Sequence, residues 1–213
     1  MAARRAAVKA GPGRRLTLLP RGGHTARVRM IAGRFRGQGI LAPRGLSTRP
    51  TSDRVREALF SILGDVAGLD VLDLFAGSGA LGLEALSRGA RSAVFVDQAR
   101  AAIAAVTDNV ATLGVGEEAT VRAAEAGAAL RALGREGRAF GLVFLDPPYA
   151  SAEAGALLSE LLAQRLLTPG AWIVLEHASR GDAPAPAGLE LRFVRTYGDT
   201  ALTFYRWPGQ EAT

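Results

Sequence analysis

Four consecutive residues, Asp146-Pro-Pro-Tyr149, have the composition of a site that acts on an amino group. They follow the apolar segment 140–145, which is typical of a buried strand, and ligands of open α/β sheets bind at the carboxyl ends of strands. Two prolines make the turn stiff, so it can aim the Asp146 carboxylate and the Pro147 carbonyl at the two hydrogens of one nitrogen. Such acceptors would free the lone pair of a nucleobase amino group for methyl transfer, while Tyr149 would stack on the base.

A glycine-rich loop follows the apolar segment 71–74 and leads into a helical pattern; its glycines are Gly77, Gly79 and Gly82. Glycines at this spacing let a ligand approach the backbone, and Asp97, at the end of the next apolar segment, can accept ribose hydroxyls. The same pattern fits an oxidoreductase that uses a nicotinamide dinucleotide. Asp73 instead favours S-adenosylmethionine, because an acid there can meet an ammonium group that a dinucleotide lacks. Residues 146–149 favour the same cofactor, because a dehydrogenase has no use for them.

From residue 70 onwards, short apolar segments alternate with stretches of helical period, which predicts a mostly parallel sheet with helices on both faces. We expect strands at 71–74, 93–96, 119–122, 140–145 and 172–175, and helices near 80–88, 99–113, 125–133 and 152–166. The segments 189–196 and 201–207 have no helix between them, so we expect an antiparallel pair at the sheet edge. Earlier in the chain, 51–64 predicts a helix capped by Thr51, Ser52 or Asp53, and 28–41 predicts a basic hairpin.

Residues 1–56 contain thirteen Arg and one Lys but a single acid, whereas acids outnumber bases in the rest of the chain. A basic N-terminal segment followed by an acidic remainder indicates a polyanionic partner, although the Arg-rich composition of the whole chain explains part of the excess of arginine. The candidate phosphate contacts are Arg34, Arg36 and Arg49. We therefore divide the chain into a disordered basic tail (1–27), a hairpin extension (28–50), a catalytic domain (51–207) and a second tail (208–213).

The composition also excludes several classes of protein. The chain has no cysteine, which rules out disulfides and cysteine-ligated metal sites, and its two isolated histidines lead us to expect no metal. No apolar run approaches the roughly 20 residues that a membrane helix needs.

Four stretches resemble the RsmD family of small-subunit ribosomal RNA guanine-N2 methyltransferases, namely residues 30–37, 49–57, 72–86 and 146–149. The resemblance covers about residues 28–207 and implies a Rossmann-like class I methyltransferase fold with a mostly parallel seven-stranded sheet. It implies S-adenosylmethionine as the cofactor. The methionine side would be contacted by Asp73, Ala76, Gly77, Ser78 and Gly79, and the ribose by Asp97 and Gln98. The adenine would be contacted by Glu125 and Ala126, where relatives often have Asp or Asn.

The family implies methyl transfer to the exocyclic N2 of a guanine in 16S ribosomal RNA, on an assembled or partly assembled small-subunit particle in the cytoplasm. We expect a monomer. Two alternatives stay open. An adenine-N6 methyltransferase of DNA or RNA would use the same tetrapeptide, although no segment is long enough for the target-recognition region of such DNA enzymes. A catalytically silent RNA-binding factor would retain the fold, although the intact Asp73, Asp97 and Asp146 argue against it.

Overall fold

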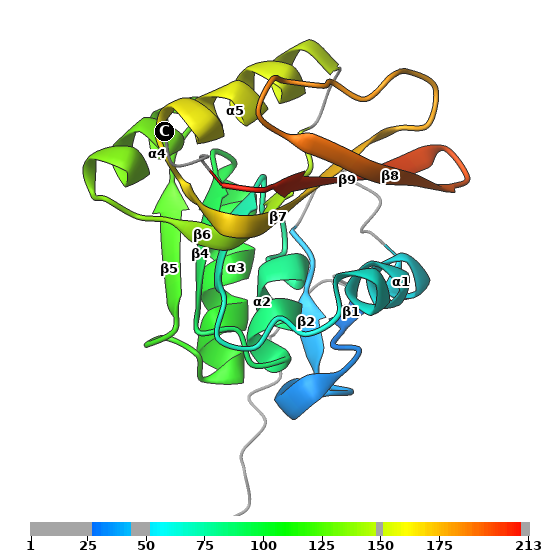
Figure 1. Cartoon of the computed structure of the whole chain (residues 1–213). Helices are drawn as coiled ribbons and strands as arrows, with labels where there is room; N and C mark the ends of the chain where they lie inside the picture. The colour runs from blue at the N-terminus through cyan, green and yellow to red at the C-terminus, as the bar shows by residue number, and fades with distance from the viewer. Residues whose placement is uncertain (1–26, 44–51, 148–150, 210–213) are drawn as a thin grey trace, which may run out of the picture.

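The chain forms a seven-stranded sheet with helices on both faces (Figure 1), in a computed structural model that describes residues 27–43, 52–147 and 151–209. The strand order is β5-β4-β3-β6-β7-β9-β8. Five strands run parallel: β3 (Asp70–Leu74), β4 (Ser92–Asp97), β5 (Ala119–Ala123), β6 (Phe140–Leu145) and β7 (Leu167–Ala178). The reversed strand β9 (Thr200–Trp207) pairs antiparallel with β7 on one side and with the edge strand β8 (Glu190–Tyr197) on the other. This arrangement confirms the predicted sheet and its antiparallel edge pair.

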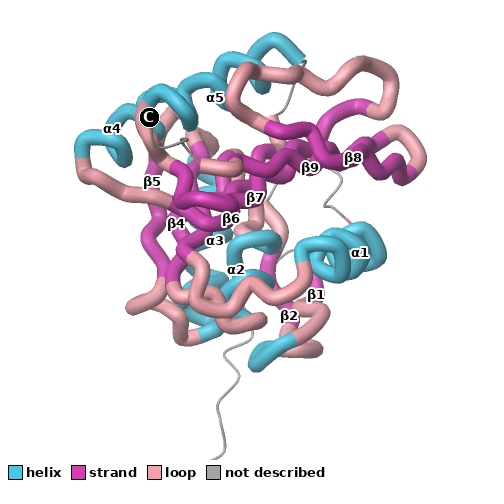
Figure 2. Tube along the Cα trace, in the orientation of Figure 1, coloured by secondary structure: helices cyan, strands magenta, loops and turns pink. Residues whose placement is uncertain are grey.

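Two hydrophobic cores lie on opposite faces of the sheet. Helices α4 (Ala126–Arg135) and α5 (Ser151–Ala163) cover one face, and α1 (Asp53–Leu63), α2 (Ala80–Ser87) and α3 (Arg100–Leu113) cover the other (Figure 2). Successive strand residues supply the two cores in turn, because side chains alternate across a sheet; Val71 joins the α1–α3 core and Leu72 the α4–α5 core. None of the helices in the described ranges has the length and apolarity needed to cross a membrane.

The predicted N-terminal hairpin is present, with shorter strands than its alternating pattern suggests. It consists of β1 (Arg27–Arg29), a single 3-10 turn η1 (Gly33–Phe35) and β2 (Gly39–Leu41). Gly33 and Gly37 have positive φ angles, which close the connecting turn instead of extending the strands. Buried side chains of the hairpin join the α1–α3 core (Val28, Met30 and Ile40). The hairpin is therefore part of the globular body, and Arg27, which we expected in the tail, belongs to β1.

Polar side chains of α2 hold this hairpin in place. The fully buried Glu84 carboxylate accepts hydrogen bonds from the backbone N–H groups of Ile31 and Ala32, at 2.8 and 2.9 Å. The Ser87 hydroxyl accepts from Phe35 N–H at 3.0 Å and donates to the Ala32 carbonyl at 2.5 Å. Buried backbone groups that lacked such partners would cost about 1–3 kcal/mol each, so these contacts fix where the hairpin docks.

Element boundaries differ from the prediction most clearly before β7. The expected helix 152–166 ends at Ala163, and β7 begins at Leu167 instead of residue 172. Arg165 has a φ of 54°, which terminates the helical path, and Leu167 already pairs with Phe140 of β6. At α1, the predicted cap is confirmed, because the Ser52 hydroxyl accepts from Val55 N–H at 3.3 Å.

Gly82 allows α2 to lie close against the sheet, and this generates a stability prediction. A Cβ added at Gly82 would lie 2.9 Å from Phe95 Cζ and 3.2 Å from an Asp73 carboxylate oxygen. We therefore expect Gly82→Ala to lower the free energy of unfolding by about 1–3 kcal/mol, as overpacking usually does. Urea unfolding measures the change. The matched control is Gly116→Ala, whose Cβ would meet nothing within 4 Å and should change stability by less than about 0.5 kcal/mol. Equal stabilities of the two variants would contradict the prediction.

Candidate active site

The strand order reverses between β3 and β6, because β4 and β5 lie to one side of β3 while β7 lies beyond β6. Ligands of open α/β sheets bind at such a reversal, outside the carboxyl ends of the strands. Four acids lie at or next to these ends: Asp73 on β3, Asp97 on β4, Asp146 after β6 and Glu176 on β7. The fold thus gathers the three acids singled out in the sequence at one edge and adds Glu176.

Asp73 is a buried carboxyl beneath the start of α2. Its exposed fraction is 3%, and one oxygen accepts a hydrogen bond from Gly82 N–H at 2.9 Å. Burial raises the pKa of Asp73 to about 7, the Gly82 hydrogen bond opposes the rise, and the negative charge of Asp97 adds to it. Without a ligand, this carboxyl is therefore partly protonated near neutral pH. A cation bound next to it would favour the ionised form.

The loop that follows β3 is a tight turn held by backbone hydrogen bonds. Ala76 N–H donates to Val96 at 3.0 Å, and Gly79 N–H donates back to Ala76 at 2.6 Å. Gly77 N–H donates to the Asp97 carboxylate at 3.0 Å, which joins the loop to the end of β4. Positive φ angles occur at Gly77 and Gly79, and also at Phe75, whose φ of 61° is unusual for a residue with a side chain. Strain of this kind is common at ligand-binding turns.

A small cleft beside this loop brings together the residues predicted for the ribose and adenine; it is lined in part by Phe75, Asp97, Gln98, Ala124, Glu125 and Ala126. Glu125 also has a structural task, because it caps α4. Its carboxylate accepts from Gly127 and Ala128 N–H, both at 2.8 Å, and these bonds lower the pKa of Glu125 below its ordinary value. Glu125 therefore fixes the start of α4 at the edge of this cleft.

Asp146, directly after β6, lies beside Glu176 of the adjacent strand β7. Leu145 pairs with Leu175 in the parallel β6–β7 ladder, so each acid follows one member of that pair. Loss of water around the Asp146 carboxylate, together with the negative charges of Glu176 and Asp73, raises the pKa of Asp146 above its ordinary range. Asp146 keeps exposed surface at the edge of the sheet, and water there moderates the rise. Within the described ranges, no three His, Asp or Glu side chains form a group that could hold a metal ion.

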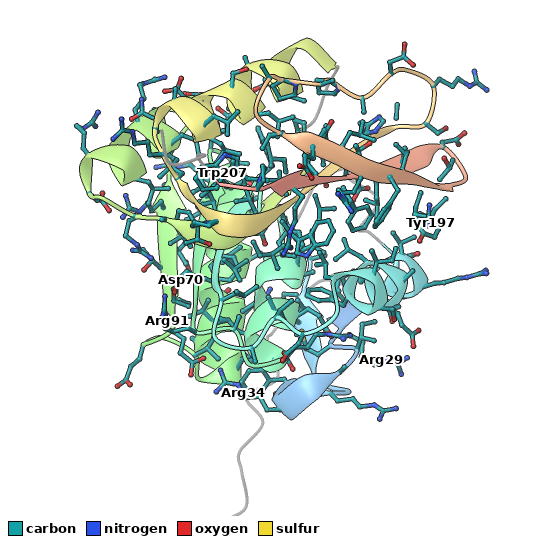
Figure 3. All side chains as sticks on the ribbon, viewed as in Figure 1. Arg29, Arg34, Asp70, Arg91, Tyr197 and Trp207 are labelled. Atoms are coloured by element: carbon teal, nitrogen blue, oxygen red, sulfur yellow. The ribbon has the colours of Figure 1, made fainter. Side chains whose placement is uncertain are left out.

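The other predicted site residues lie next to Asp146, on the hairpin, or outside the described residues. Pro147 follows Asp146 and is half-buried, whereas Tyr149 and Arg49 fall outside the described residues. Arg34, on the hairpin with Arg29 (Figure 3), forms an ion pair with Glu118 and lies 4.7 Å from the Phe35 ring centre. Glu118 immediately precedes β5, so Arg34 lies at the amino ends of the strands, away from the acids. Arg36 is exposed on the same hairpin.

Sequence reasoning missed two buried polar residues that organise this region. Glu84 is the single charged residue of α2, and Asn109 lies among the buried positions of α3. Asn109 is 1% exposed and hydrogen-bonds both the hairpin residue Leu41 and the loop residue Ser78. A polar side chain on an apolar helix face was the available signal, because buried polar groups almost always have partners.

The raised pKa of Asp73 predicts a pH-dependent stability. The folded state binds the Asp73 proton more tightly than the unfolded chain, so this contribution is complete in acid and is lost as pH rises through about 7. The neutral Asp73→Asn variant, which keeps an oxygen for Gly82 N–H, should therefore gain about 1–3 kcal/mol more at pH 8 than at pH 5.

Thermal unfolding without ligand at the two pH values measures this difference. Asp70→Asn is the control, because Asp70 lies at the other end of β3 and its hydrogen bond with Arg91 lowers the pKa of Asp70 (Figure 3). It should lose similar stability at both pH values, since Asp70 is ionised throughout that interval. A gain from Asp73→Asn that does not depend on pH would mean that Asp73 titrates normally.

Comparisons with known proteins support a common origin along almost the whole described chain. A family model described as "Conserved hypothetical protein 95" matches residues 28–206. YlbH of Bacillus subtilis (strain 168) is 39% identical over 184 residues, covering 85% of this chain and 100% of that protein. Ribosomal RNA small subunit methyltransferase D of Escherichia coli (strain K12) is 34% identical, with 87% and 93% covered. A solved structure of a hypothetical protein from Thermus thermophilus has a TM-score of 0.71 at 38% identity, with 83% and 98% covered. The chain therefore belongs to this family, together with the ribosomal RNA small subunit methyltransferase D proteins.

Proposed function

We propose that this protein transfers a methyl group from S-adenosylmethionine to the exocyclic N2 amino group of a guanine in small-subunit (16S) ribosomal RNA. The observation that carries the proposal is the position of Asp146, directly after β6 at the reversal of strand order and beside the loop 76–79. Membership in a family with named ribosomal RNA methyltransferases supports the substrate class. The chemistry of the crevice supports the cofactor and the target atom.

The described side chains suit a ligand that carries positive charge. When bound, S-adenosylmethionine supplies a methyl group activated by its sulfonium. Asp73, with its pKa raised by burial, would be stabilised in its ionised form by the ammonium of such a ligand. Asp97 would accept the ribose hydroxyls, and the loop residues Ala76 to Gly79 would lie against the methionine part. The cleft at Gln98, Glu125 and Ala126 would take the adenine.

Asp146 and Pro147 would prepare the amino group of the target base. The carboxylate and the carbonyl are both acceptors, and together they can take the two amino hydrogens and hold the lone pair towards the methyl donor. Asp146 would then accept the proton that the nitrogen loses after methylation, a task for which a raised pKa is favourable. Tyr149, three residues after Asp146, would stack on the base.

The pairing of β6 with β7 favours guanine over adenine. Asp146 and Glu176 follow the paired residues Leu145 and Leu175, so two carboxyl acceptors lie side by side. Guanine presents two neighbouring donor groups, N1–H and N2–H₂, whose nitrogens are both bonded to C2, whereas adenine presents an acceptor at N1 next to its amino group. An acceptor facing Glu176 would be repelled.

The N-terminal region is the proposed contact with ribosomal RNA. Arg36 and Arg49 are its candidate phosphate contacts, and Arg34 would contribute where the RNA passes the hairpin end. The ion pair of Arg34 with Glu118 partly offsets its charge, so we expect a smaller contribution from this residue. The substrate would be an assembled or partly assembled small-subunit particle in the cytoplasm, bound by a monomer.

Cofactor affinity should depend on the charge of Asp97. Asp97→Asn is expected to weaken S-adenosylmethionine binding by about 1.5–3 kcal/mol, because the ribose hydroxyls lose a charged acceptor. Isothermal titration calorimetry measures the affinity, and Asp70→Asn at the far end of β3 serves as the control with unchanged binding. Wild-type affinity in Asp97→Asn would show that the ribose lies elsewhere.

Methyl transfer should depend on Asp146 far more than cofactor binding does. Asp146→Ala and Asp146→Asn are both expected to reduce the single-turnover rate about 10²–10³-fold. Ala removes the acceptor at the reacting nitrogen, and Asn removes the negative charge and the group that accepts the proton. S-adenosylmethionine affinity should stay close to that of the wild type. The wild-type rate should also rise with pH as Asp146 ionises, and this rise should disappear in Asp146→Asn.

The measurement is methylation of small-subunit particles with isotope-labelled cofactor, followed by mass spectrometry of the product nucleosides. N2-methylguanosine is the expected product. N6-methyladenosine would replace the substrate assignment and keep the mechanism. No transfer by the wild-type protein, with RNA still bound, would instead identify a catalytically silent RNA-binding factor. Full activity of Asp146→Ala would reject the mechanism.

A further inference from the structure

Asn109 on α3 joins the N-terminal hairpin to the loop that follows β3. Its side-chain oxygen accepts from Leu41 N–H at 2.8 Å, and its amide nitrogen donates to the Leu41 carbonyl at 2.9 Å. The same amide nitrogen donates to the Ser78 carbonyl, also at 2.9 Å. Asn109 is 1% exposed, so no bulk water competes for these three hydrogen bonds. One buried side chain therefore binds the end of β2 and the middle of the loop at the same time.

The Ser78 carbonyl belongs to the peptide unit whose N–H is that of Gly79. Gly79 N–H donates to Ala76 at 2.6 Å and closes the loop, while Gly79 itself is left-handed, with φ 75° and ψ 16°. A peptide unit is planar, so fixing its carbonyl also fixes the direction of its N–H. A Cβ at Gly79 would lie 3.3 Å from Val106, which shows how closely α3 supports the loop. Asn109 thus sets the orientation of the peptide unit on which the turn depends.

We propose that Asn109 is a positioning residue through which the docking of the β1–β2 hairpin sets the shape of the 76–79 loop. Cofactor affinity then depends on whether the hairpin is firmly docked. A ribosomal RNA that holds the hairpin would strengthen cofactor binding, and the cofactor would strengthen RNA binding by the same factor. The RNA part of this inference rests on the proposed function, whereas the link between hairpin and loop does not.

The other anchors of the hairpin allow this link to be tested. The Ser87 hydroxyl bonds to Phe35 and Ala32, which both belong to the hairpin and its turn. Ser87→Ala therefore loosens the hairpin while leaving the Asn109 bonds available. Asn109→Ala removes the connection itself. Ile173→Val is the control for a general loss of stability, because Ile173 is buried in the α4–α5 core on the opposite face.

The experiment is a double-mutant cycle on the full chain, with S-adenosylmethionine affinity measured by calorimetry. We expect Asn109→Ala and Ser87→Ala each to weaken binding about three- to tenfold, the effect of losing one net hydrogen bond. The double variant should bind no more weakly than Asn109→Ala, because the connection has already been cut. Ile173→Val should bind like the wild type. Wild-type affinity in Asn109→Ala, or multiplying effects in the double variant, would overturn the proposal.

A second measurement and a fallback variant keep the test decisive. Hydrogen exchange at the Gly79 amide can be measured without a ligand. The protection of this amide should fall in Asn109→Ala and in Ser87→Ala but not in Ile173→Val. Unchanged protection in Asn109→Ala would overturn the proposal. If Asn109→Ala does not fold, Ser87→Ala decides the test, because Ser87 anchors the hairpin and does not itself bond to the loop. Unchanged Gly79 protection in that variant would overturn the proposal. A wild-type protein that binds no S-adenosylmethionine would contradict the proposed function alone, and Gly79 exchange would still decide the coupling.

Discussion

The contact between Gly82 and the buried Asp73 carboxyl is the constraint on which the crevice depends. Because Gly82 has no Cβ, α2 can approach Phe95 closely enough for the Gly82 N–H to reach Asp73. That approach fixes where α2 begins, and therefore how the loop 76–79 must turn between β3 and the helix. The hairpin docks on the same helix through Glu84 and Ser87, so its position follows from the same contact.

Electrostatics give this geometry a chemical character. Asp73, Asp97, Asp146 and Glu176 gather along one edge of the sheet. Loss of surrounding water, and to a lesser extent the neighbouring negative charges, raises the pKa values of Asp73 and Asp146. Such a concentration of acids is unfavourable until a cation binds or a proton is taken up, because like charges in partly dehydrated surroundings repel one another. A positively charged cofactor and a reaction that releases a proton would both relieve this repulsion. Under the proposed function, cofactor binding would offset the stability that these acids cost the folded protein.

Where the structure departs from expectation, tertiary packing is the reason. The apolar pattern predicts a strand only from residue 172, yet Leu167 already pairs with Phe140 because the chain turns at Arg165. Charge alone groups Arg34 with the phosphate contacts, yet the turn at Gly33 carries it to the amino ends of the strands, where Glu118 binds it. Each of these outcomes depends on a partner distant in sequence or on a local turn that periodicity does not encode.

The sequence alone determined the alternation of strands and helices, the antiparallel edge pair, and the acids Asp73, Asp97 and Asp146 at strand ends. These features follow from hydrophobic period and from short motifs, which are local properties of the chain. Only the tertiary structure decided that Glu176 lies beside Asp146 and that Asn109 bridges Leu41 and Ser78. The register of two parallel strands and the docking of a hairpin on helices more than fifty residues away are set by long-range packing, and no local pattern records them.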